Sequence, residues 1–156
     1  MNLFLRSALI SGITLSTITA GFCENSPQPS LQDSQKAFEY FENELNFTTN
    51  PQGTKQVVDG KVKNVTIIDV RDEKSFAEGH IPGAINMPAK KYNNFAGAET
   101  EFPGLRKDGF NYVYCYENLC SLAQKAAKKF ASLGYPVKEI AGGFEEWKEH
   151  QYPIEK

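Results

Sequence analysis

The sequence has little material for several kinds of site. Its 156 residues contain only three cysteines and two histidines, which are too few for a disulfide-rich scaffold and a poor basis for a zinc centre. Its 17 Lys and Arg residues do not exceed its 19 Asp and Glu residues, so no basic excess is present to bind nucleic acid. With 40% hydrophobic and 23% charged residues, the chain is neither disordered nor fibrous. What is left is one small folded domain whose function depends on a local site.

The N-terminal region predicts export. Residues 1–20 contain a single charge, Arg6, followed by a short apolar run that is interrupted by Ser, Thr and Gly. This pattern is typical of a secretory signal peptide and is too short for a membrane span. We expect cleavage after Ala20 or after Cys23, no stable membrane insertion afterwards, and a periplasmic location if the source is a Gram-negative bacterium. Residues 21–32 are polar and contain prolines, so they predict a flexible linker.

The rest of the chain alternates between helical and strand patterns. Apolar residues at i, i+3 and i+7 from Phe38 predict a helical extension over residues 33–54, followed by the main domain over residues 55–156. The sequence predicts a break at 50–53, where Asn and Pro stand. Strands are expected at 65–70, 84–87, 111–115 and 137–140, with helices between them. Such alternation predicts an α/β fold with a mainly parallel sheet and helices on both faces.

Cys115 is a candidate nucleophile by its position. It ends the strand expected at 111–115, and Ser121 and Gln124 have the spacing of a capping box at the start of the next helix. Sites in parallel sheets form beyond the carboxyl ends of the strands. Backbone N–H groups of a loop there, together with a helix N-terminus, favour an anion and a thiolate. The alternative is that Cys115 is a buried structural residue.

Several stretches resemble motifs of the rhodanese family in the family's order. Residues 67–72 and 79–88, with Phe76 between them, are similar to its first motif. The stretch around Cys115 and residues 142–147 are similar to its active loop and closing motif. The resemblance implies that residues 55–156 form one rhodanese domain with a five-stranded, mainly parallel sheet.

The resemblance also implies sulfurtransferase chemistry at Cys115, in a loop of six residues. Its thiolate would take the outer sulfur of a small donor such as thiosulfate as a persulfide, and cyanide or a thiol, including a protein thiol, would remove it. No metal or organic cofactor is implied. Asp69 and Arg71 are expected at the same rim, where Arg71 binds either the donor anion or a carboxylate such as Glu78. The residues expected to bind substrate are Tyr116, Glu117, Asn118, Leu119, Cys120 and Ser121.

Two features of this loop leave alternatives open. Glu117 opposes thiolate formation and repels thiosulfate, which predicts weak activity with that donor. Cys120 is either a resolving thiol, which would make the protein a dithiol redox protein, or an inert residue at the helix start. A non-catalytic rhodanese module that binds a partner is a further alternative. Phosphatase activity is disfavoured because Ser121 stands where related phosphatases carry an arginine.

Overall fold

The computed structural model describes residues 31–93 and 102–156. The predicted signal peptide and its cleavage sites lie outside the described residues, as does the predicted linker up to residue 30. A helix begins at Leu31, so the last two residues assigned to the linker are helical. Among the described residues, no helix combines the length and the hydrophobicity needed to span a membrane.

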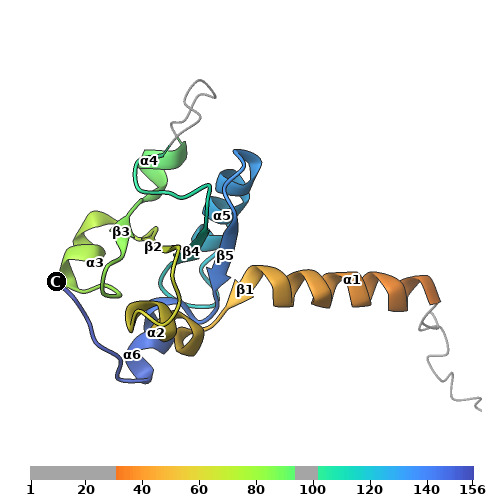
Figure 1. Ribbon diagram of the computed structural model, residues 1–156, viewed down its shortest axis with the longest axis horizontal. Coiled ribbons are helices and arrows are strands. Elements are labelled where there is room, and N and C mark those ends of the chain that lie inside the picture. Colours follow the sequence, from red (N-terminus) through yellow and green to blue (C-terminus); the bar gives the residue numbers. More distant parts are fainter. Residues whose placement is uncertain (1–30, 94–101) are drawn as a thin grey trace, which may run out of the picture.

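The described chain forms a five-stranded sheet with helices on both faces (Figure 1). The strand order is β1-β5-β4-β2-β3, and every neighbouring pair is parallel. The strands are β1 (Thr48–Thr49), β2 (Val65–Asp69), β3 (Ile85–Asn86), β4 (Phe110–Tyr114) and β5 (Val137–Ile140). The helices are α1 (Leu31–Phe47), α2 (Pro51–Val58), α3 (Glu73–Glu78), α4 (Ala89–Asn93), α5 (Leu122–Ser132) and α6 (Gly143–Glu149). The α/β class expected from the alternation is confirmed.

Alternating side chains of the central strands supply two separate cores. On β2, Ile68 packs on the side of α5, whereas Ile67 packs on the side of α6. On β4, Val113 joins the α5 core and Tyr114 joins the α6 core, as the two-residue period of a strand requires. Both faces of the sheet are therefore buried, which fits the mostly apolar and β-branched composition of β2.

The region between α1 and β2 differs from the prediction. Asn50 and Pro51 do not simply break the chain, since they begin α2: the Asn50 side-chain oxygen accepts a hydrogen bond of 2.8 Å from the Gly53 amide. Pro51 lies in the first turn of α2, where the missing backbone N–H removes no helical hydrogen bond. The boundary predicted between residues 54 and 55 consequently falls inside α2.

The expected capping box at the start of α5 is wrong. Ser121 precedes the helix, but its side chain makes no capping hydrogen bond. Its backbone has φ −72° and ψ 2°, whereas a residue whose side chain caps a helix is usually extended. Ser121 therefore belongs to the loop that follows β4 and contributes no cap.

Candidate active site

Cys115 follows β4 directly, at the carboxyl edge of the sheet, and the loop after it ends where α5 begins. The neighbouring strand β2 ends at the same edge, because Asp69 is paired in register with Tyr114. Arg71 lies two residues beyond Asp69. The structure thus brings the sequence-predicted residues Cys115, Asp69 and Arg71 to one rim, as the parallel topology requires.

The N-terminus of α6 is hydrogen-bonded to the loop that follows β4. The amide of Phe144 donates to the Cys115 carbonyl, and the amide of Glu145 donates to the Tyr116 carbonyl, each at 2.9 Å. A third bond of 2.6 Å joins the Gly142 amide to the side-chain oxygen of Asn118. These contacts use N–H groups that a helix start otherwise leaves without partners.

Gly143 makes this close approach possible. Its φ is +57°, and a Cβ at this position would stand 2.7 Å from the Cys115 carbonyl oxygen. Such a distance excludes any other residue without movement of the loop or of α6. The contact of Gly143 with the loop was not expected from the sequence; the signal available was the pair of consecutive glycines, Gly142 and Gly143.

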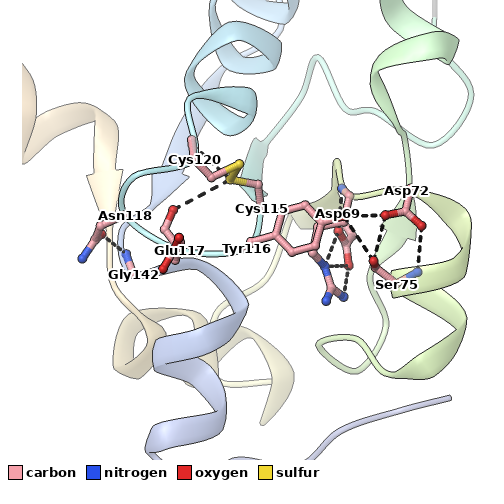
Figure 2. The surroundings of a disulfide bond; sticks show 10 residues. Asp69, Asp72, Ser75, Cys115, Tyr116, Glu117, Asn118, Cys120 and Gly142 are labelled. Atoms are coloured by element: carbon pink, nitrogen blue, oxygen red, sulfur yellow. Dashed lines mark hydrogen bonds and ion pairs between the residues drawn. A yellow bond between two sulfur atoms is a disulfide. The ribbon is translucent and has the colours of Figure 1, made fainter.

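Cys115 and Cys120 are joined by a disulfide bond (Figure 2). Their Cα atoms are 6.4 Å apart, within the range of about 4.4–6.8 Å that such bonds span. Cys115 is 2% exposed and packs in the α5 core, and Cys120 is half-buried. The Cys120 amide donates to the Glu117 carbonyl at 3.0 Å, which closes the loop into a turn.

The remaining loop residues are exposed to solvent, including those whose side chains make hydrogen bonds. The exposed residues are Tyr116, Glu117, Asn118, Leu119 and Ser121. Leu119 is 90% exposed and forms the apolar tip of the loop. Glu117 is solvated, so its charge acts on the cysteine through water and is screened.

Tyr116 ties the loop to the start of α3. Its hydroxyl donates to the Asp72 carboxylate and lies 3.1 Å from the Ser75 hydroxyl. Asp72 is also the N-cap of α3, accepting a bond of 3.0 Å from the Ser75 amide. The hydrogen bond from Tyr116 lowers the pKa of Asp72, and the two bonds from Ser75 lower it further. The sequence analysis missed Asp72, although an Asp three residues before Ser75 is a cap signal.

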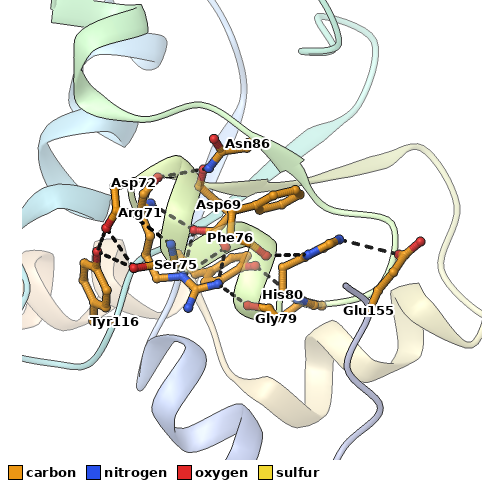
Figure 3. Close-up of polar contacts among 12 residues, drawn as sticks. Asp69, Arg71, Asp72, Ser75, Phe76, Gly79, His80, Asn86, Tyr116 and Glu155 are labelled. Atoms are coloured by element: carbon orange, nitrogen blue, oxygen red, sulfur yellow. Dashed lines mark hydrogen bonds and ion pairs between the residues drawn. The ribbon is translucent and has the colours of Figure 1, made fainter.

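Arg71 binds a carboxylate, as one of the two predictions had it, but the carboxylate is that of Asp69 and not that of Glu78 (Figure 3). Nε donates to both carboxylate oxygens of Asp69 at 3.0 Å, and Nη2 donates to Oδ2 at 2.6 Å. Nη2 also donates to the Gly79 carbonyl at 2.7 Å. Asp69 is fully buried and Arg71 is 4% exposed. Burial lowers the pKa of Arg71, but the hydrogen bond and the charge of Asp69 outweigh it and raise the pKa overall. A buried carboxylate needs such a partner, whereas Glu78 is solvated.

A cavity of about 620 Å³ opens beside the loop. Arg71 and Tyr116 line it, together with Phe144 and Lys148 of α6. Cys115 is not among its described lining residues, and its sulfur is bonded to that of Cys120. The described residues contain no group of three or more His, Cys, Asp or Glu side chains that could hold a metal ion.

Comparisons with known proteins agree with the geometry. The rhodanese-like domain family matches residues 52–150. Thiosulfate sulfurtransferase GlpE of Coxiella burnetii is 35% identical over 92 residues, which cover 58% of this chain and 78% of that protein. GlpE of Shewanella oneidensis is 35% identical over 91 residues, covering 57% and 81%. The crystal structure of the BH2092 protein from Bacillus halodurans superposes with a TM-score of 0.64 at 29% identity, over 78% of this chain and 85% of that chain. Because the family model matches more than half of the chain, this chain belongs to the rhodanese-like domain family.

Proposed function

We propose that the protein is a rhodanese-type sulfurtransferase in which Cys115 carries the transferred sulfur. The observation that carries this proposal is the place of Cys115, directly after β4 in a loop held by the first amides of α6. The relatives named thiosulfate sulfurtransferase are 35% identical to the chain over the 91 or 92 aligned residues and support the same reaction class.

The reaction proceeds in two balanced half-reactions. The Cys115 thiolate attacks the outer sulfur of thiosulfate, the S–S bond of the donor breaks, and sulfite leaves with the bonding electron pair. The persulfide on Cys115 then gives its outer sulfur to cyanide or to a thiol, and the thiolate returns. Thiocyanate or a new persulfide is the product. Neither half-reaction needs a cofactor, because the cysteine sulfur is both nucleophile and leaving group.

The loop backbone supports the anionic steps. The carbonyls of Cys115 and Tyr116 accept hydrogen bonds from α6. In a trans peptide the N–H group points opposite to its carbonyl, so the amides of Tyr116 and Glu117 point away from α6. These amides are the donors that we assign to the sulfur anions. We assign Arg71 the role of holding the rim of the site in place, because its guanidinium is already hydrogen-bonded to the Asp69 carboxylate.

Intact mass spectrometry of the reduced protein tests the proposal. Incubation with thiosulfate is expected to add one sulfur atom, and cyanide is expected to remove it. The Cys115→Ser variant should stay unmodified, and Cys120→Ser should still gain the sulfur. If Cys120→Ser gains no sulfur, or if Cys115→Ser gains as much as the wild type, Cys115 is not the carrier.

The disulfide favours a second candidate function, that of a dithiol redox protein. The Cys120 thiolate attacks the inner sulfur of the Cys115 persulfide, hydrosulfide leaves, and the Cys115–Cys120 bond forms. An external dithiol then reduces this bond by exchange and becomes a disulfide itself. Export, which stays a prediction because residues 1–30 are not described, suits this chemistry, since disulfides persist in oxidising compartments.

Sulfide release distinguishes the two candidates. A redox protein should release one hydrosulfide per persulfide and lose two hydrogens, and Cys120→Ser should retain the sulfur instead. A plain sulfurtransferase should release no sulfide without an added acceptor, and its turnover with cyanide should be unchanged in Cys120→Ser.

A further inference from the structure

α1 packs little against the rest of the described structure. It leaves the edge of the sheet at β1 and extends away from the domain (Figure 1). Every residue from 33 to 47 is exposed. Most of the stability of a helix in a protein comes from the packing of its apolar side. The 17 residues of α1 gain little of it within the single chain, and a partner along the apolar side would supply it.

One side of α1 is strongly apolar. Phe38 and Phe41 are 66% and 61% exposed, and Leu45 is 80% exposed. Their spacing of three and four residues places them on one stripe of the helix. We call these three residues the α1 stripe. Contiguous exposed apolar surface of this kind marks an interaction site.

An apolar groove lies near the base of α1. Its volume is about 400 Å³, and its lining comes from the end of α1, from α5 and from the chain leading into β5. The apolar lining residues are Phe47, Ala127, Ala131, Tyr135, Pro136 and Val137. We call this the α5 groove.

The charges around the two surfaces are opposite. α1 has four acidic residues against one lysine, and the acids Glu42 and Glu44 flank its stripe. α5 has three lysines and no acidic residue, and Lys128 lines the groove. Glu139 lines the β5 side of the groove and would repel an acidic helix. The acidic flank of a docked α1 is therefore expected on the α5 side, where Lys128 lies.

We propose that the α5 groove is occupied by the α1 stripe of a second copy of this chain. α1 cannot fill its own groove, because it runs directly into β1 and points away from the domain (Figure 1). Each copy carries both surfaces, and a two-fold axis lets both pairs form at once. The occupant is therefore the same helix that lacks cover in the single chain.

Sedimentation equilibrium of the purified chain tests the dimer. We expect the wild type to form a dimer with a dissociation constant below about 100 μM. Phe41→Glu is expected to raise this dissociation constant about tenfold or more. Asn43→Glu is the matched control, since it adds the same charge on the opposite side of α1. Circular dichroism confirms that both variants fold. A wild type that is monomeric at this concentration, or equal effects of the two substitutions, would overturn the proposal.

A charge exchange tests which surfaces meet. One variant carries Lys125→Glu and Lys128→Glu, and the other carries Glu42→Lys and Glu44→Lys. Each variant alone is expected to be monomeric because its two surfaces repel, and an equimolar mixture is expected to form heterodimers. If the lysine-to-glutamate variant stays dimeric on its own, α1 does not dock on α5, and the proposal is wrong.

Discussion

At the scale of single residues, the site depends on close contacts between backbone atoms. Gly143 lets α6 approach until its amides reach the carbonyls of Cys115 and Tyr116. Asp69 and Arg71 fix the rim beside them as a buried pair. The exposed side chains of the loop include no cationic donor. The chemistry therefore depends on the backbone conformation in which Gly143, Asp69 and Arg71 hold the loop and its rim.

Gly143→Ala should destabilise the protein and displace the loop. The new Cβ meets the Cys115 carbonyl oxygen at 2.7 Å and lies at a φ of +57°. We expect a loss of about 2–4 kcal/mol in the free energy of unfolding, measured with urea, and slower sulfur transfer. Gly134→Ala is the control, because it has a φ of +82° and no neighbour within 4 Å. It should lose only about 1 kcal/mol. Equal losses in the two variants would show that the contact with the loop contributes nothing.

Tyr116→Phe should change the acid dependence of stability. The hydrogen bond from Tyr116 lowers the pKa of Asp72 from its ordinary 3.8. A lowered pKa in the folded state stabilises the fold above the ordinary value, and this contribution disappears as the pH falls through the lower folded value. The variant should therefore be less stable than the wild type at pH 7, and the difference should shrink below about pH 4. Urea titrations at several pH values measure it; a difference that is constant with pH would contradict the assignment.

At the scale of elements, segments with an apolar or amphipathic pattern of their own could be predicted, and even the two-residue β3 lies within the strand expected at 84–87. Residues 65–70 and 137–140 contain enough β-branched or apolar residues to identify β2 and β5. β1 has two residues and forms only because β5 pairs with it, so no local pattern marks it. The pairing of Cys115 with Cys120 stayed open for a similar reason, since the distance between them depends on the turn of the loop.

α2 shows how a break signal can also begin a helix, and its cap is testable. Asn50→Ala removes the side-chain oxygen that accepts from the Gly53 amide. We expect a loss of about 1 kcal/mol in the free energy of unfolding. Asn50→Asp keeps an acceptor at the same position and should restore most of that stability. If both substitutions have the same effect, the cap does not stabilise α2.

At the scale of the whole molecule, the disulfide couples stability to activity. The bond closes a short loop, with a sequence separation of five residues, and restricts the unfolded chain. For so short a loop the expected gain is about 2 kcal/mol. The same bond occupies the sulfur that carries out sulfur transfer, so reduction should activate the protein while lowering its stability.

Denaturant unfolding with and without a dithiol reductant measures this coupling. The wild type should unfold at a lower urea concentration when it is reduced, and sulfur transfer should appear at the same reductant concentration. Cys120→Ser should unfold at the same urea concentration in both conditions and should accept sulfur without a reductant. If reduction leaves the unfolding of the wild type unchanged, the bond between Cys115 and Cys120 does not constrain the chain. If Cys120→Ser still requires the reductant, a different disulfide controls access to Cys115.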